Sequence, residues 1–301
     1  MKKVSNNLAL AICAAMLVSS VFTACKKDDA PVITPPVLIG GYASSDSVAS
    51  ASLVAYFPFD GNANDTKGGK TATTSSRVTF NTGIRGQAYQ GDSGAYATLT
   101  PSAAFSSLPS YSFSVWYKLA AQPKAGDPGG MFFLAGTTTL NEMIYEIESF
   151  NPKSGDSVKV HHGFTDLGSP GYKGFTMESF DTAAINKWVL LTTTYDGASS
   201  IYTIYQNGVA IGNNSAFGQN ITPTPMWTDG TKTTPLGNLN FNSDPPAQII
   251  IGTWPATLYG VSPALGVNGS FEGQMDELRI FNKALSSTEV VGLYLNGKAG
   301  R

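Results

Sequence analysis

The chain has 301 residues, two cysteines and a formal net charge of −2 at pH 7. Only 13% of its residues are charged, whereas glycine is abundant and aromatic residues reach 11%. There is no basic stripe for binding nucleic acid, and this uncharged, glycine-rich and aromatic composition is typical of a secreted all-β protein.

Residues 1–24 are predicted to be a signal peptide. Two lysines precede an apolar run, Leu8 to Val18, that is too short to span a bilayer as a helix. The segment VFTAC at 21–25 then resembles a bacterial lipoprotein cleavage site, at which Cys25 becomes the lipidated N-terminus. Phe22 departs from the Leu that is usual there. The alternative is an ordinary signal peptide with a chance cysteine.

Residues 25–51 are predicted to form a flexible tether, because they carry Pro-Pro and Gly-Gly and lack periodicity. The run KKDD at 26–29 resembles the signal that sends lipoproteins to the cell surface in Bacteroidetes. Cys13 would leave with the signal peptide and Cys25 would be acylated, so no thiol remains for a disulfide, a metal or a nucleophile. We expect an outer-membrane protein, anchored by its lipid only and facing the cell exterior.

Residues 52–301 are predicted to form one domain of short strands. Alternating apolar and polar residues, separated by turn residues, mark these strands: LVAYF (53–57), YSFSVWYKL (111–119), MIYEIE (143–148), SVKVHH (157–162), WVLLTTTYD (188–196), QIIIG (248–252) and MDELRIF (275–281). A hairpin at 200–212 turns at Asn207-Gly208, a pair that tolerates the positive φ of a type I′ turn. The pattern predicts an all-β, two-sheet antiparallel sandwich.

One helix is expected at the C-terminal end. Ser286 and Glu289 fit a capping box, and Val290 and Leu293 follow with helical spacing. Gly297 is predicted to end this helix.

Several of these segments resemble the laminin-G-like, concanavalin A-like jelly-roll family. They are LVAYFPFDGNANDTKGG (53–69), FSVWYKL (113–119), WVLLTTTYDGASSIYTIYQNGVAIG (188–212), IIIGT (249–253) and GQMDELRIFNKALSSTEVVGLY (273–294), in the family's order. The resemblance implies a jelly roll of two curved sheets. It also implies a non-catalytic module that binds glycans or proteins, often with a structural calcium ion, and often carried by a Bacteroidetes surface lipoprotein.

Asp276 shares period two with Leu278 and Ile280, which predicts that a carboxylate faces the core. Such a group must be paired, hydrogen-bonded or metal-bound. Asp60 and Asn62 in the turn at 59–65 supply oxygens of the kind that Ca²⁺ binds. With Asp276 and main-chain carbonyls they would hold a structural calcium ion, which the resemblance favours.

Asp276 has alternatives that need no metal. It would accept backbone N–H bonds from the glycine-rich turn, or pair with Arg279 or Arg77.

Catalysis is not expected, although Glu146 and Glu148 share one strand face at a spacing that fits a pair of glycosidase carboxylates. Family-16-type glucanases read Glu-x-Asp-x-x-Glu, and this segment has Glu for Asp and no third acid. We interpret the two as charges on the solvent face. The only histidines, His161 and His162, point to opposite faces of their strand and would not share one metal.

Ligand binding is predicted in two long loops, 212–247 and 253–270, because structureless loops of that length are usually functional or disordered. An aromatic ring can stack on a sugar while polar groups bind its hydroxyls. The candidates are Trp227, Trp254, Tyr259, Asp229, Asn240, Asn242 and Asp244. The alternative is that both tryptophans only pin these loops, and Trp116 and Trp188 are expected to be structural.

The sequence therefore predicts a non-catalytic cell-surface lipoprotein that binds a glycan, in polysaccharide capture. The alternative is an adhesion or protein-interaction module with protein partners in a surface complex. A glycoside hydrolase or lyase is the third reading.

Overall fold

The computed structural model describes residues 37–122, 128–137, 142–148, 158–165, 184–212, 223–228, 231–241, 244–255 and 269–301, and the backbone of 174–181. Cys25 and the predicted signal peptide lie outside these residues. So do Asp229, Asn242 and Tyr259.

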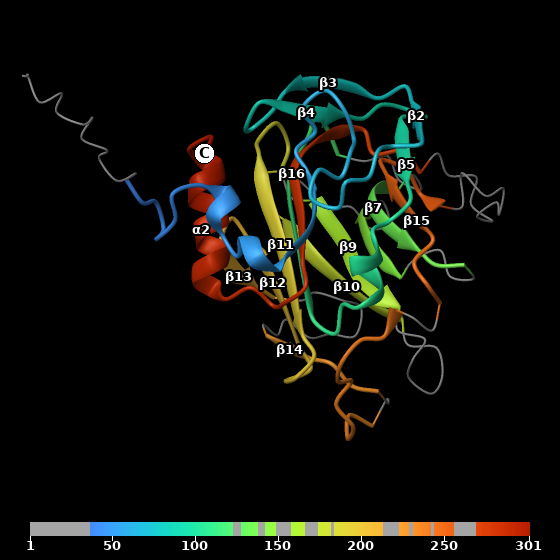
Figure 1. Ribbon diagram of the computed structural model, residues 1–301, viewed down its shortest axis with the longest axis vertical. Helices are drawn as coiled ribbons and strands as arrows, with labels where there is room; N and C mark the ends of the chain where they lie inside the picture. The colour runs from blue at the N-terminus through green and yellow to red at the C-terminus, as the bar shows by residue number, and fades with distance from the viewer. Residues whose placement is uncertain are drawn as a thin grey trace, which may run out of the picture. The chain divides into compact units, whose positions relative to one another are not determined.

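The described residues form two antiparallel sheets, which confirms the predicted sandwich. The nine-stranded sheet has the order β13-β12-β11-β6-β16-β4-β3, with β1 paired to β16 and β14 to β12 (Figure 1). Its strands are β1 (Leu53–Phe57), β3 (Thr79–Thr82), β4 (Gln87–Gln90), β6 (Tyr111–Leu119), β11 (Val189–Asp196), β12 (Ile201–Gln206), β13 (Val209–Ile211), β14 (Thr224–Pro225) and β16 (Gly273–Phe281).

The seven-stranded sheet has the order β10-β9-β8-β7-β15-β5-β2. Its strands are β2 (Thr74–Ser76), β5 (Tyr96–Leu99), β7 (Gly129–Ala135), β8 (Met143–Glu148), β9 (Val158–Thr165), β10 (Gly174–Asp181) and β15 (Gln248–Ile251). Every predicted strand is present. The sequence did not predict β2, β3, β4, β5, β7, β10 or β14.

Alternation along the strands builds the core between the sheets. Tyr111, Phe113, Val115 and Tyr117 of β6 all point into it, as their spacing predicts. The rings of Phe113 and Tyr145 stack with their centroids 3.5 Å apart, which joins β6 of one sheet to β8 of the other.

The outer face of the nine-stranded sheet is covered by the helix α2 (Ser287–Lys298), which Figure 1 shows on the side away from the seven-stranded sheet. Ser286 and Glu289 form the predicted capping box. Trp116 stacks on Tyr294 of the helix at 5.8 Å and is 3% exposed. None of the helices in the described ranges is long and apolar enough to cross a membrane.

Gly297 does not end the helix, contrary to the prediction. The helix continues to Lys298, and Gly300 takes the left-handed conformation beyond it. A Cβ on Gly297 would lie 2.6 Å from Nε1 of Trp116, so glycine here lets the helix approach the sheet closely.

Residues 37–51 pack against the domain, although the sequence placed them in a flexible tether. Val48 is 1% exposed and belongs to the cluster beneath α2. The backbone N–H and hydroxyl of Ser45 both donate to the carbonyl oxygen of Arg301, which ties this segment to the C-terminal end.

A β-bulge in β16 changes the expected direction of Asp276. The register with β6 shifts between Asp276 and Arg279, and Glu277 has a φ of +54°. Met275 and Leu278 therefore both point into the core, with two residues between them. Asp276 lies opposite Trp116 on the outer face, so the prediction that it faces the core with Leu278 was wrong.

Four charged groups and a tyrosine form a network on this outer face, where β1 and β16 pair. Nη2 of Arg279 donates to Glu277 at 2.6 Å and to Asp46 at 2.8 Å. Arg85 also donates to Asp46, and the Tyr56 hydroxyl donates to Glu277 at 2.6 Å. The side chains of Arg279 and Glu277 are 4% and 2% exposed. The network joins the N-terminal segment, the loop before β4, and β16.

We predict that Glu277→Gln lowers the free energy of unfolding by about 3–5 kcal/mol, because it leaves the buried Arg279 guanidinium without its nearest counter-charge. Urea unfolding of the two proteins measures this. Asp92→Asn is the control, because its pair with Arg77 is more than 60% exposed on both sides, and it should leave the midpoint unchanged. Equal midpoints for Glu277→Gln and the parent protein would contradict the account.

Candidate functional site

Asp276 is covered by the loop at 83–87. It is 0% exposed, and its Oδ2 accepts hydrogen bonds from the backbone N–H groups of Ile84 at 2.8 Å and Arg85 at 3.1 Å. Its Oδ1 is buried and has no hydrogen-bond partner within the described ranges. Burial raises the pKa of Asp276 to about 8, although the N–H groups of the loop act in the opposite direction.

The two other predicted calcium ligands lie in the turn at 59–65. Oδ1 of Asp60 accepts from the backbone N–H of Gln87 at 2.7 Å, so Asp60 and Asp276 hold opposite ends of the same loop. The side chain of Asn62 bonds locally, to the carbonyl of Asp60 and the N–H of Asn64. The partner of Asp276 is thus the loop at 83–87 and not this turn. Its orphaned Oδ1 is the atom that fits a cation.

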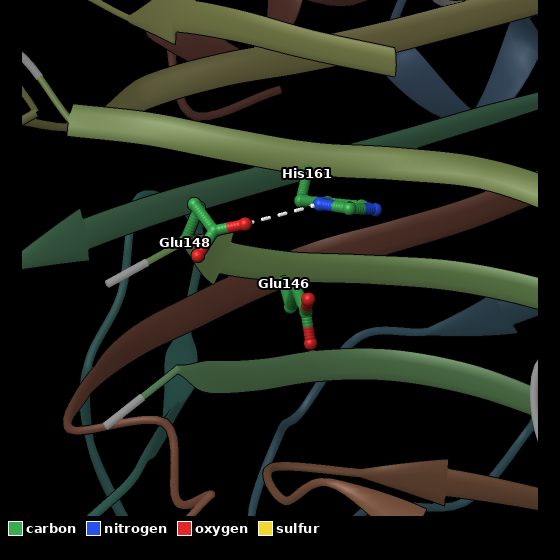
Figure 2. Close-up of side chains that lie close together, drawn as sticks. All are labelled: Glu146, Glu148 and His161. Carbon is green, nitrogen blue, oxygen red and sulfur yellow. Dashed lines mark hydrogen bonds and ion pairs between the residues drawn. The ribbon is translucent and has the colours of Figure 1, made fainter. Parts of the chain in front are cut away.

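A second group of acids lies on the outer face of the seven-stranded sheet. Glu146 and Glu148 project from β8, and His161 projects from β9 directly opposite Glu146 (Figure 2). One ligand atom from each of the three lies within 4.8 Å of the others. Nδ1 of His161 is 3.2 Å from Oε2 of Glu148. The register of two neighbouring strands therefore assembles the group.

The two carboxylates of this group are removed from water, contrary to the expectation of solvent-face charges. Glu146 and Glu148 are 4% and 8% exposed. Oε2 of Glu146 has no hydrogen-bond partner among the described residues. Burial raises the pKa of Glu146 to about 7, although the neighbouring His161 acts in the opposite direction. Two buried carboxylates on one strand face are costly to fold unless a donor or a cation compensates them.

Trp254 borders the acidic group. It follows β15, is partly buried, and packs on an apolar cluster of the same face that contains Phe133, Ile144 and Ile250. Its side chain also donates a hydrogen bond to Glu146. The outer face therefore places an aromatic ring, two carboxylates and an imidazole side by side.

His162 points the other way, as the sequence predicts for neighbours on a strand. It is 0% exposed, and its ring stacks between those of Tyr145 and Tyr202. Its Nδ1 is 3.1 Å from the Tyr202 hydroxyl. This histidine belongs to the core.

Of the other predicted ligand residues, the structure describes Trp227, Asn240 and Asp244, and it places Trp227 and Asp244 in surroundings different from those of Trp254. Trp227 follows β14, bridges to Pro235 and belongs to the end of the nine-stranded sheet. Asp244 is 2% exposed and accepts hydrogen bonds from the backbone and hydroxyl of Thr137, so it holds the chain beyond β7. Asn240 is exposed.

A cavity of about 500 Å³ lies near the ends of β4, β6 and β16. Its polar lining includes Gln90, Lys118, Gln122, Asn186, Glu272 and Gln274. Amide side chains of this kind suit the hydroxyls of a polar ligand.

The chain belongs to the family described as the concanavalin A-like lectin/glucanases superfamily, whose profile matches residues 91–245, just over half of the sequence. A comparison with curated proteins found no match.

Solved structures share the fold at low identity. The binding domain of botulinum neurotoxin serotype G is 16% identical with a TM-score of 0.51, over 80% of this chain and 50% of that one. The binding domain of Paraclostridial Mosquitocidal Protein 1 is 13% identical with a TM-score of 0.52, over 81% and 52%. The botulinum serotype D ligand binding domain, solved with N-acetylneuraminic acid, is 16% identical with a TM-score of 0.51, over 84% and 51%. This chain spans about half the length of each.

Sequence reasoning missed the cluster of Glu146, Glu148 and His161. The sequence shows each residue only within its own strand. The pairing of β8 with β9 brings the three side chains together. That register is hard to predict because residues 149–157 separate the strands, and a connection of that length fixes no turn type.

Proposed function

We propose that this protein binds glycans without hydrolysing them, and that the outer face of the seven-stranded sheet around Trp254 is the binding surface. The observation that carries the proposal is the partly buried Trp254 ring beside buried carboxylates on an apolar strip. A ring of this kind stacks on the apolar face of a sugar.

The membership of a lectin and glucanase superfamily supports this proposal, as does the sugar bound by the botulinum serotype D domain. The absence of the glucanase pattern around Glu146 favours binding over cleavage. Incubation with a bound polysaccharide should release no reducing sugar. Release that is lost in Glu146→Gln would instead make the protein a hydrolase.

We further propose that Cys25 carries a lipid, which would hold the protein on the outer membrane, facing the exterior, where it would capture polysaccharide. This rests on the VFTAC and KKDD segments of the sequence. Calcium is proposed at Asp276, whose buried Oδ1 has no partner in the described part of the chain. Such an ion would compensate a carboxylate that burial otherwise disfavours in its charged form.

We predict saturable binding on an array of plant and host polysaccharides, and a loss of about tenfold or more in Trp254→Ala, which corresponds to about 1.4 kcal/mol of ring contact. Trp254→Phe keeps a ring and should retain most of the binding, which separates contact from folding. Titration calorimetry with the selected glycan gives the constants.

Three control variants locate the site. Trp188→Ala makes the same truncation of a half-buried tryptophan on the other sheet, and should leave binding intact. Trp227→Ala tests the end of the nine-stranded sheet, and Glu272→Ala tests the cavity. Binding that survives Trp254→Ala and disappears in either of these two refutes the proposed surface. An array without any bound glycan favours an adhesion or protein-interaction module.

Calcium removal is expected to destabilise the protein. A chelator should lower the melting temperature and added Ca²⁺ should restore it, because a bound ion would compensate the buried carboxylate of Asp276. Asp276→Asn keeps the shape of the side chain and should abolish the response, whereas Asp92→Asn should not. A melting temperature that changes with neither chelator nor Ca²⁺ would argue against a calcium site.

Lipidation is tested with labelled fatty acid in bacteria that express the full chain. Label should enter the parent protein and the Cys13→Ser variant, and Cys25→Ser should remain unlabelled and leave the membrane fraction. Label retained in Cys25→Ser would exclude this cysteine as the anchor.

A further inference from the structure

The group of Glu146, Glu148 and His161 has the composition of a transition-metal site. Two carboxylates and one imidazole come from adjacent strands, and their nearest ligand atoms lie within 4.8 Å of one another. Figure 2 shows the Glu148 carboxylate directed toward the His161 ring, whereas the Glu146 carboxylate extends toward the strand on the other side of β8. Strands hold such groups more rigidly than loops do, because the backbone ladder fixes their spacing.

Glu146 adds a second and independent observation. It is 4% exposed, and its buried Oε2 has no hydrogen-bond partner among the described residues. The bond from Trp254 leaves this oxygen unsatisfied. An oxygen that has been taken out of water without a donor lacks the compensation that buried polar groups ordinarily have. A cation between the two carboxylates would supply it.

We propose that Glu146, Glu148 and His161 bind one divalent transition-metal ion of the Mn²⁺ or Zn²⁺ type on the outer face of the seven-stranded sheet. This site is separate from the calcium proposed at Asp276, which projects from the other sheet. It goes beyond the proposed glycan binding, which requires no metal.

The donor set distinguishes between metals. Calcium binds through six to eight oxygens, and an imidazole nitrogen is not among its usual ligands. Imidazole with carboxylate suits zinc and its neighbours in the first transition row, and manganese accepts carboxylate readily. Ligands around a tetrahedral zinc ion with bonds near 2.1 Å lie about 3.4 Å apart. The distances between the three ligand atoms would need to shorten by about 1.4 Å at most, from 4.8 Å. Rotation about the side-chain torsions of the two glutamates can provide this.

Binding is tested with Mn²⁺ on the untagged full chain. Mn²⁺ prefers oxygen ligands, so Cys13 and Cys25 would not compete for it if the chain is prepared without processing or acylation. Electron paramagnetic resonance of free Mn²⁺, with excess Ca²⁺ present, should show one saturable site. Glu148→Gln and His161→Gln should each weaken it at least about tenfold, the loss that groups merely supporting a metal ligand already cause. Glu272→Gln, an exposed acid elsewhere, is the matched control and should change nothing.

Glu146→Gln separates a metal ligand from a structural carboxylate. Without metal this variant should melt at a higher temperature than the parent, because it removes an uncompensated buried charge. Mn²⁺ should raise the melting temperature of the parent but not that of the variant. The absence of a saturable site would overturn the proposal, as would equal affinity in all variants or a metal-free Glu146→Gln that melts below the parent. None of these measurements involves a glycan, so their outcome tests the metal site independently of the glycan proposal.

Discussion

A carboxylate that folding removes from water must find a donor or a cation, and this constraint governs both acidic regions of the protein. In β16 the constraint is met for Glu277, which accepts hydrogen bonds from Arg279 and Tyr56. It is met in part for Asp276, because one oxygen accepts two backbone N–H bonds while the other has no partner within the described ranges. In β8 it is also met in part, because one oxygen of Glu146 has no partner in the described residues.

The closure of the sandwich depends on β16, which pairs with β1, β4 and β6. The bulge at Glu277 rotates the strand so that Leu278 stays in the core while Asp276 turns outward, beneath the loop at 83–87. α2 covers the outer face of this sheet around Trp116. The proposed binding groups project from the outer face of the other sheet, beside the apolar cluster that Trp254 packs on.

Features that depend only on the sequence of one strand, helix or turn were predictable. The alternation from Tyr111 to Tyr117 located β6, and the positive φ of Asn207 and Gly208 matches the predicted hairpin turn. The short strands β2, β3 and β4 are rich in polar residues, and β5 has only four residues with little alternation, so tertiary pairing defines them. The bulge in β16 was not predictable, because one extra residue reverses the faces without changing the composition. The proposed site on β8 and β9 could not be predicted, because it depends on the pairing register of the two strands. Residues 149–157 separate them, and a connection of that length does not fix the register.

We propose that the outer face of the seven-stranded sheet holds a metal ion that compensates Glu146. Anomalous diffraction from crystals of the full chain grown with Mn²⁺ tests it most directly. The account predicts a single strong peak on this face, within bonding distance of Glu146, Glu148 and His161. A face without a peak, in which both Glu146 oxygens accept hydrogen bonds from ordered water or from the chain, would contradict it.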